Sequence, residues 1–267
     1  ARSLGETPVT MAVRAGKMAL EHAGVRPHQV GMVLANNDTP FEMIPSTANL
    51  VAKALGIPGG FHSDQNSACS SFALHMYTLG RMNEKKIPEF ILTLQCAAYT
   101  TRIDYSPKSI DGYIFGDGAA AQIVSTRHQG RLTVEPMIFE TGPAQADEIV
   151  VDSCGHFTQN GAVVREFSIR KTCEMLEQIA QKKELYAEQV YTVAHQANFV
   201  MQKSILGHLH LPLERHIRNV QTQGNIAAAG APSAIAQRLD ALHKGDQIAY
   251  AVLGAGLAWG GGYMEVQ

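Results

Sequence analysis

Apolar positions along the chain follow two alternating patterns, helical spacing and short continuous runs. The helical spacing predicts helices in both halves of the chain, over residues 8–23, 46–55, 70–82, 164–183, 198–209 and 232–245. Continuous apolar runs bounded by turn residues predict buried strands over residues 30–36, 90–97, 119–125, 190–194, 247–254 and 258–266. Strands that alternate with helices in this way predict an α/β protein.

The order of helices and strands in the first half is repeated in the second half. The two halves meet near residues 125–135, and no Pro- or Ser-rich linker separates them. We therefore expect an N-terminal half over residues 1–127 and a C-terminal half over residues 128–267, packed together as one integrated unit.

Composition narrows the function classes. Charged residues make up 17% of the 267 residues, against about 25% in a typical globular protein, which favours a large layered core, an oligomer interface, or both. The net charge of −2 disfavours a nucleic-acid-binding protein, because neutralising phosphates requires clustered Lys and Arg. No apolar run approaches the ~18 residues of a membrane span. The four cysteines form no CxxC pair, a pattern typical of a reduced, cytoplasmic protein.

Cys69 is the first candidate for chemistry. It lies in the segment QNSACSSFALHM, directly before the helix expected over residues 70–82. The unpaired N–H groups and the dipole at a helix start favour a thiolate, and the small neighbouring residues leave room for a substrate. A free cysteine is also often a small buried apolar residue, and position alone favours neither interpretation.

His195 and Asn225 are two further candidates. His195, in VYTVAHQANFV, follows a predicted strand, where ligands of open α/β sheets gather; position alone favours a simpler role as the cap of the next helix. Asn225, in TQGNIAAAGAPSAI, lies between a predicted strand and a helix, and position alone favours a turn residue.

Other candidates are weaker. Asp117, in the FGDGAAA turn, is interpreted as a turn residue, and Cys96, Cys154 and Cys173 as structural. The chain contains no GxSxG, P-loop or HExxH motif. The HLH segment at residues 208–210 has no carboxylate or cysteine beside it, so we expect no metal site and no bound cofactor.

As a set, Cys69, His195 and Asn225 are more specific than each is alone. The chain resembles the thiolase-superfamily condensing enzymes, above all the β-ketoacyl-acyl carrier protein synthase III (KAS III) group. The resemblance lies in the chain order of these residues, in the motifs NSAC (66–69), HQAN (195–198) and GN (224–225), and in the FGDGAAA and GAGLAWGGG segments. The resemblance covers essentially the whole chain. It implies a thiolase-like five-layer αβαβα fold built from two duplicated halves, and a homodimer.

The resemblance implies a decarboxylative Claisen condensation for fatty-acid initiation or a polyketide or other specialised metabolite. Cys69 takes an acyl group from a thioester. The neutral N–H donors of His195 and Asn225 stabilise the enolate that a malonyl thioester forms on losing CO2. The enolate then attacks the acyl group, whose oxyanion is held by the backbone N–H groups of Cys69 and Ala255. Such a site needs no charged residue.

The resemblance also implies a tunnel for the phosphopantetheine arm of coenzyme A or of acyl carrier protein. We expect the substrate contacts to come from Asn198, Gly224, Gly256 and Ile44. Ile44 and Met43, in the PFEMIPS segment, are expected to shape the tunnel of the partner subunit. The expected partners are thus an acyl-CoA, a malonyl thioester, with acyl carrier protein as the alternative carrier, and a second copy of the chain.

Three features depart from the pattern that the resemblance implies. Residues 8–23 match the family's first helix, and the strand and loop that precede it are absent; we therefore expect a fragment or partly disordered form with an open sheet edge, unless residues 1–7 or another segment supply a paired strand. Residues 199–201 are Phe-Val-Met where a basic residue often helps carrier-protein docking, and Lys203 is a candidate replacement. The Gly254–Gly256 turn has alanine in the middle where many relatives have glycine.

Three alternatives remain open. An acyltransferase or thioesterase that forms no carbon–carbon bond is disfavoured by Asn225, because such transfer needs a base more than an enolate site. A non-catalytic subunit of a heteromeric synthase is disfavoured because Cys69, His195 and Asn225 are all retained. A papain-like hydrolase shares the residue order but not the local sequence around its cysteine.

Overall fold

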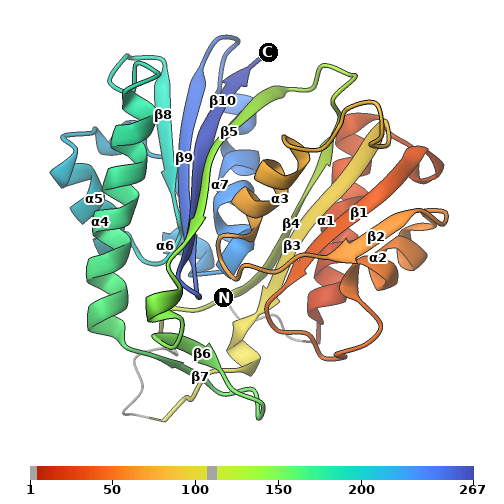
Figure 1. Ribbon diagram of the computed structural model, residues 1–267, viewed down its shortest axis with the longest axis horizontal. Helices are drawn as coiled ribbons and strands as arrows, with labels where there is room; N and C mark the ends of the chain where they lie inside the picture. Colours follow the sequence, from red (N-terminus) through yellow and green to blue (C-terminus); the bar gives the residue numbers. More distant parts are fainter. Residues whose placement is uncertain (1–4, 107–112) are drawn as a thin grey trace.

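The computed structural model describes residues 5–106 and 113–267, which form two four-stranded sheets and one small two-stranded sheet (Figure 1). The first sheet has the order β2-β1-β3-β4. Its strands are β1 (Val30–Asn37), β2 (Phe61–Asp64), β3 (Phe90–Ala98) and β4 (Asp117–Val124). β1 is parallel to β2 and β3, whereas β4 is antiparallel to β3.

The second sheet has the order β5-β10-β9-β8. Its strands are β5 (Leu132–Thr141), β8 (Val190–Ala194), β9 (Gln247–Gly254) and β10 (Ala258–Val266). β8 is parallel to β9, and β10 is antiparallel to both of its neighbours. The small sheet pairs β6 (Ile149–Val151) with β7 (Phe157–Gln159).

Helices lie outside and between the two large sheets (Figure 1). α1 (Pro8–Ala23) and α2 (Thr47–Leu55) pack on the outer face of the first sheet, and α4 (Gly161–Ala180) and α5 (Phe199–His208) lie on the outer side of the second. α3 (Ser71–Leu79) and α7 (Gly230–Arg238) lie between the sheets. The order is therefore helix, sheet, helix, sheet, helix, and the α/β class is confirmed.

Short elements connect these layers. α6 (Val220–Gln223) is a single helical turn. The 3-10 helices are η1 (Pro27–Gln29), η2 (Tyr99–Thr101), η4 (Pro143–Gln145), η5 (Leu213–Arg215), η6 (Ala227–Ala229) and η7 (Leu239–Ala241).

Side chains of β1 alternate between two cores, as the pleat of a strand requires. Leu34 lies in the central core with Phe72 of α3 and Tyr250 of β9. Val33 lies in the outer core beneath α1 and α2. The same alternation turns Asn36, at the end of β1, toward the central layer, so polar groups enter the molecule where the strand ends.

Local signals fix the ends of the first two helices. The side chain of Thr7 caps α1, and Gly24 ends it with a left-handed φ of 64°. The side chain of Ser46 caps α2, and Gly56 ends it with a φ of 70°. These are the capping residues that helix starts and ends prefer.

Four strands were not predicted: β2, β5 and the two three-residue strands β6 and β7. β2 carries the sequence FHSD, whose Phe61 is exposed, so no apolar run marks it. β5 has half-buried and exposed positions and a proline, Pro136, within it. The helix expected over residues 232–245 is shorter: α7 ends at Arg238, and η7 follows.

The antiparallel strands β4 and β10, which correspond in the two sheets, differ in their number of neighbours. Within residues 5–106 and 113–267, β4 pairs with β3 alone, whereas β10 lies between β9 and β5. Residues 5–7 form no strand there, and residues 1–4 lie outside the described residues. β4 is therefore an edge strand of the first sheet in the described part of the chain.

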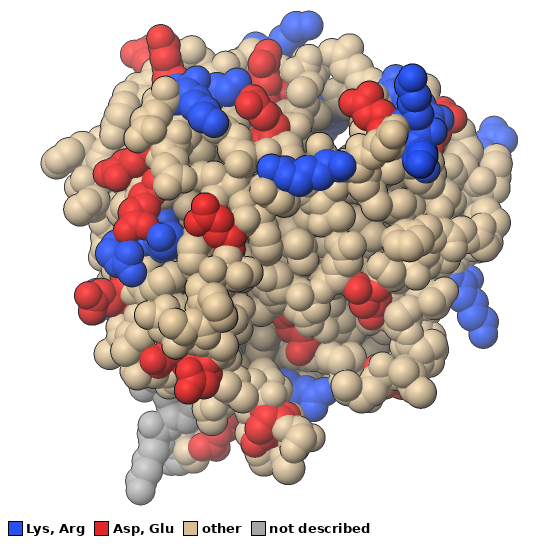
Figure 2. All heavy atoms as spheres, in the orientation of Figure 1, with Lys and Arg blue, Asp and Glu red and all other residues tan. Residues whose placement is uncertain are grey.

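The low charge content is visible at the surface. Figure 2 shows wide areas of one face that carry no Lys, Arg, Asp or Glu side chain. No helix in the described ranges is long and apolar enough to cross a membrane.

Candidate active site

Cys69 lies in a tight turn between β2 and α3, two residues before the helix begins. The preceding residue, Ala68, has a φ of 46°, a left-handed conformation that a side chain disfavours. The side-chain Oδ1 of Asn66 accepts a hydrogen bond from the Ala68 N–H at 2.7 Å, and Ser67 N–H donates to Ser71 Oγ at 2.8 Å. These bonds hold the strained turn that presents the thiol.

The ionisation of Cys69 is opposite to the sequence expectation. Burial raises the pKa of the Cys69 thiol well above its usual value, and the nearby Asp38 carboxylate raises it further. The backbone N–H of Cys69 lowers the pKa, but this effect is smaller. The helix start therefore does not make Cys69 a resting thiolate, because desolvation outweighs the favourable backbone dipoles.

The hairpin between β9 and β10 meets this turn from the other half of the chain. A Cβ atom on Gly254 would lie 2.5 Å from Ser67 O and 2.8 Å from the backbone nitrogens of Cys69 and Ser70. Only glycine permits so close an approach. The structure thus brings the turn that contains Ala255 and Gly256 against the backbone of Cys69.

His195 directly follows β8, and its backbone N–H donates to Ala251 O of β9 at 3.0 Å. The cap of α5 is Asn198, whose Oδ1 accepts from Met201 N–H at 2.9 Å. The capping role considered for His195 therefore belongs to Asn198. Burial lowers the pKa of His195 to about 4, so the imidazole is neutral near pH 7 and donates one N–H.

Asn225 is buried and held by backbone bonds to the segment before β4. Its N–H donates to Ile114 O at 2.9 Å, and its carbonyl accepts from Gly116 N–H at 3.0 Å. Its Oδ1 accepts from Ala227 N–H at 3.0 Å, which leaves Nδ2 without a partner in the described part of the chain. Gly224 has a φ of 72°, and a Cβ there would lie 3.0 Å from Ile114 O, so backbone packing explains this glycine.

A shared cluster joins the segments that carry the candidates. The Cys69 side chain packs at the edge of a core that contains Tyr99, Phe157 and Ala227, two residues after Asn225. His195 lies beside β9, whose last residue, Gly254, lies against the backbone of Cys69. The structure therefore gathers the segments of all three residues in one region.

Sequence reasoning missed a charged group in this region. The side chain of Asp38, just beyond β1, accepts a hydrogen bond from Asn36 Nδ2 at 2.9 Å. Desolvation raises the pKa of Asp38 to about 6, although the bond from Asn36 lowers it. The proposed chemistry needs no charged residue, yet the structure places this carboxylate where it raises the pKa of Cys69. The sequence signal is the polar NND run at the end of an apolar strand, which also suits an ordinary turn.

The other titratable candidates have structural surroundings. Asp117 accepts hydrogen bonds from Thr100 N–H at 3.0 Å and Thr100 Oγ1 at 2.7 Å, so it anchors the start of β4. Cys96 and Cys173 are buried, Cys154 is exposed, and all three are unpaired. The described residues contain no group of three His, Cys, Asp or Glu side chains placed to hold a metal ion.

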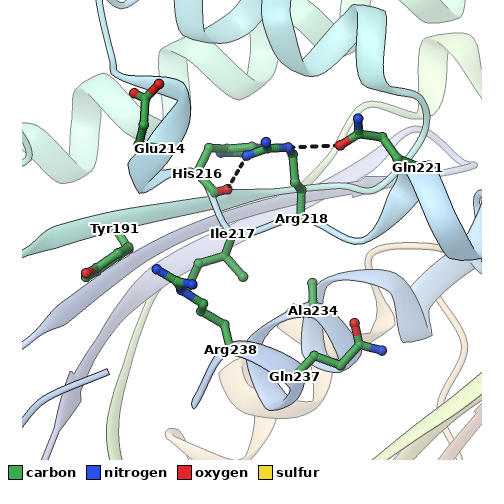
Figure 3. Close-up of a pocket in the computed structure, with 9 residues that line it drawn as sticks. All are labelled: Tyr191, Glu214, His216, Ile217, Arg218, Gln221, Ala234, Gln237 and Arg238. Carbon is green, nitrogen blue, oxygen red and sulfur yellow. Dashed lines mark hydrogen bonds between the residues drawn. The ribbon is translucent and has the colours of Figure 1, made fainter. Parts of the chain in front are cut away.

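Ile44 and Met43 lie on the loop between β1 and α2, with exposed fractions of 85% and 84%. Their predicted contribution to a partner subunit is not tested by a single chain. A cavity of about 360 Å³ opens elsewhere, at the edge of the second sheet, where Arg218 and Arg238 approach it from two elements (Figure 3). None of the predicted site residues lines this cavity.

Two mixed sheets around a shared helical layer, with the segments that carry Cys69, His195 and Asn225 meeting from both halves, define a thiolase-like α/β protein. Comparison with known families agrees. The model of 3-oxoacyl-[acyl-carrier-protein] synthase III matches residues 63–141, and the model of the C-terminal part of that synthase matches residues 180–266.

Individual relatives match most of the chain. The β-ketoacyl-[acyl-carrier-protein] synthase III of Rubrobacter xylanophilus is 30% identical over 259 residues, or 96% of this chain and 82% of that protein. The crystal structure of the 3-oxoacyl-[acyl-carrier-protein] synthase III of Aquifex aeolicus has a TM-score of 0.88 at 26% identity, and the match covers 99% of this chain and 86% of that one. The chain therefore belongs to the β-ketoacyl-[acyl-carrier-protein] synthase III family of condensing acyltransferases.

The same fold is found in a solved structure of lower sequence identity. The priming β-ketosynthase of a polyketide biosynthetic pathway has a TM-score of 0.86 at 23% identity, and the match covers 99% of this chain and 83% of that one.

Proposed function

We propose that the protein joins an acyl group held on Cys69 to a malonyl thioester by decarboxylative Claisen condensation. The observation that carries the proposal is the meeting of the Cys69 turn with Gly254 and with the Asn225 segment. Family membership supports the reaction class, and the residue roles follow from the chemistry that these side chains offer.

In the first step, Cys69 Sγ attacks the thioester carbonyl of the acyl donor and expels the donor thiol. The proton of the Cys69 thiol ends on that leaving thiol, so the step is balanced. The backbone N–H groups of Cys69 and Ala255 stabilise the oxyanion that forms, since Gly254 brings the two chain segments together.

In the second step, a malonyl thioester loses CO2, and the electron pair forms an enolate. His195 and Asn225 donate hydrogen bonds to the enolate oxygen. The lowered pKa of His195 keeps its ring neutral, and Nδ2 of Asn225 is available because its Oδ1 is the atom that bonds Ala227. Each such donor is worth about 3 kcal/mol, or ~100-fold in rate. The enolate carbon then attacks the acyl carbonyl, the thioester bond to Cys69 Sγ breaks, and the released thiolate takes up one proton from solvent.

The proposal includes the substrate path and the assembly. Asn198, Gly224 and Gly256 contact the phosphopantetheine arm of coenzyme A or acyl carrier protein, and Ile44 of one subunit reaches the tunnel of its partner. The halves 1–127 and 128–267 act as one unit, because each supplies part of the site. Four unpaired cysteines favour action in the reducing cytoplasm.

Intact-protein mass spectrometry tests the assignment. Wild-type protein is expected to gain one acyl group from an acyl thioester, and the Cys69→Ala variant none, whereas Cys154→Ala, which removes an exposed thiol, is a matched control that still gains it. His195→Ala and Asn225→Ala are expected to gain the acyl group but to lose decarboxylation of malonyl-CoA by ~100-fold or more. Normal condensation by Cys69→Ala would overturn the proposal.

Product analysis separates the remaining alternatives. A carbon–carbon product that requires the malonyl donor supports condensation. Hydrolysis or transfer to an alcohol or amine without that donor identifies an acyltransferase or thioesterase. Failure of wild-type protein to acquire any acyl group points to a non-catalytic subunit.

A further inference from the structure

Asp38 is a buried acidic side chain in the Cys69 region that the proposed mechanism does not use. We propose that Asp38 is a positioning and charge-control residue for Cys69: it anchors a chain of side-chain hydrogen bonds to the Cys69 turn, and its buried, uncompensated carboxylate adds to the effect of burial in disfavouring a negative charge on Cys69 Sγ. The inference rests on the proposed role of Cys69 as nucleophile.

The hydrogen-bond chain runs from Asp38 to the turn through two asparagines. Asn36 Nδ2 donates to Asp38 Oδ1 at 2.9 Å and to Asn66 Oδ1 at 3.1 Å, so both hydrogens of its amide group are used. Asn66 Oδ1 also accepts from Ala68 N–H at 2.7 Å. Asp38 therefore fixes the orientation of Asn36, and Asn36 fixes the oxygen that holds the strained Ala68 peptide next to Cys69.

The second carboxylate oxygen gives the group its electrostatic effect. Asp38 Oδ2 is buried and has no hydrogen-bond partner among the described residues, and no Lys or Arg in the described ranges forms an ion pair with it. Nothing compensates the negative charge locally, so it acts on neighbouring groups across a medium of low dielectric constant. A thiolate at Cys69 adds a second negative charge and is therefore disfavoured.

The titratable groups that face Asp38 come from each element packed around it. They are the Cys69 thiol before α3, the Cys96 thiol on β3 and the Tyr99 phenol on η2, and the Asp38 charge raises the pKa of all three. Arg102 donates to Pro40 O at 2.7 Å, two residues beyond Asp38. The thiols and the phenol are uncharged while they are protonated. The Asp64 carboxylate on β2 also raises the pKa of Cys96, whereas Asp38 is the carboxylate that raises the pKa of Cys69.

The pH profile of Cys69 alkylation by iodoacetamide tests the charge role. Peptide mapping separates Cys69 from Cys96. The Asp38→Asn variant keeps an oxygen acceptor for Asn36 but removes the charge. The pH at which Cys69 reacts at half its maximal rate is expected to fall by about one unit, which is ~10-fold faster alkylation on the rising part of the profile. Asp38→Ser, a second neutral acceptor, is expected to shift the profile in the same direction.

Two further variants separate charge from position. Asp64→Asn is the matched control, because Asp64 also ends a strand of this sheet but binds the backbone of α2, at Thr47 N–H and Ala48 N–H; its profile is expected to match wild type. Asn66→Ala breaks the hydrogen-bond chain and keeps the charge. It is expected to slow acylation of Cys69 while leaving the midpoint of the alkylation profile in place.

The outcomes are distinct. A Cys69 profile that is the same in Asp38→Asn, Asp38→Ser and wild type would overturn the inference, as would an equal shift in Asp64→Asn. Alkylation needs no acyl thioester. If the profile shifts as expected but wild-type protein is never acylated, the proposed function fails and the charge coupling stands.

Discussion

The ends of β1 and β8 occupy corresponding places in the two sheets, but their buried polar groups differ. β1 is parallel to β3, which pairs with the antiparallel strand β4. In the same way, β8 is parallel to β9, which pairs with the antiparallel strand β10. After β8, Gln196 Nε2 donates to Ala194 O at 2.8 Å, and its Oε1 accepts from Asn219 N–H at 3.0 Å and Val220 N–H at 3.3 Å. Every polar group of this side chain is used.

At the end of β1 the polar groups are only partly used. Asn36 Oδ1 and Asp38 Oδ2 are buried without a hydrogen-bond partner in the described part of the chain, and so is Gln95 Oε1 on the adjacent strand β3. Buried polar atoms normally have partners, and exceptions gather where function requires them. The Gln196 side chain after β8 is therefore fully bonded, although the neighbouring Asn219 Oδ1 is buried without a partner. In contrast, three side chains in the Cys69 region of the first half each keep an unpartnered buried oxygen.

The largest loss of activity is expected from a substitution at the contact between the two halves. Gly254→Val would force a side chain into Ser67 O and the backbone of Cys69, so the turn must move. Because small displacements of reacting groups cost ~100-fold in rate, acylation of Cys69 is expected to fall by at least that factor. The rate of acyl transfer, followed by mass spectrometry, checks this.

A glycine in open space provides the control for that variant. Gly207, in α5, has no atom within 4 Å of an added Cβ. Gly207→Ala is expected to keep activity and to raise the free energy of unfolding by roughly 0.5–1 kcal/mol. Equal acylation by Gly254→Val and wild type would contradict the arrangement of the two halves.

The two halves are expected to differ in how their stability depends on pH, because the pKa values of their buried groups are shifted in different ways. In the second half, the pKa of His195 and of His216 is lowered from 6.5 to about 4 by burial, so the unfolded chain binds protons first and stability is lost as the pH falls from about 6.5 to 4. In the first half, the pKa of His75 is also lowered to about 4, but the pKa of Asp38 is raised to about 6. Protonation of Asp38 favours the folded state, so the two effects oppose each other there.

Urea unfolding between pH 7 and 5 measures this balance. The free energy of unfolding is expected to fall with acid by about 1.4 kcal/mol per pH unit for each net proton that unfolding takes up. His216→Asn is expected to reduce the proton uptake on unfolding by up to one proton, so the free energy of unfolding depends less steeply on pH. Asp38→Asn is expected to make this dependence steeper. The same slope in both variants and in wild type would contradict the assigned protonation states.

Hydrophobic periodicity predicted most of the fold because most elements bury one regular face. It missed β2 because that strand is short and partly exposed, and it missed β5 because Pro136 and exposed positions interrupt the pattern. Strand pairing is a long-range property that no local pattern contains. The layered order therefore depended on the family resemblance.

In the site, too, local motifs could be predicted from the sequence, whereas features that depend on packing could not. Cys69, His195 and Asn225 stand in motifs that a single chain displays, and the structure gathers their segments. Asp38 has no such motif, because an NND run suits a turn as well as an active-site region. Its significance depends on burial and on the absence of a partner for Oδ2 within the described residues, both of which arise only when distant segments pack.

One substitution in each half tests how much the hydrogen bonds of Gln196 and of Gln95 contribute to stability. Gln196→Leu removes the partners of Asn219 N–H, Val220 N–H and Ala194 O. Unfolding is expected to become easier by about 3 kcal/mol or more, since each buried polar group left without a partner costs roughly 1–3 kcal/mol. Gln95→Leu breaks one bond, from Gln95 Nε2 to His75 Nδ1, and also removes an oxygen that is already unpartnered. Its cost is expected to be about 1 kcal/mol or less. Urea midpoints compare the two variants, and equal losses of stability would contradict the difference in hydrogen bonding between the Gln196 and Gln95 side chains.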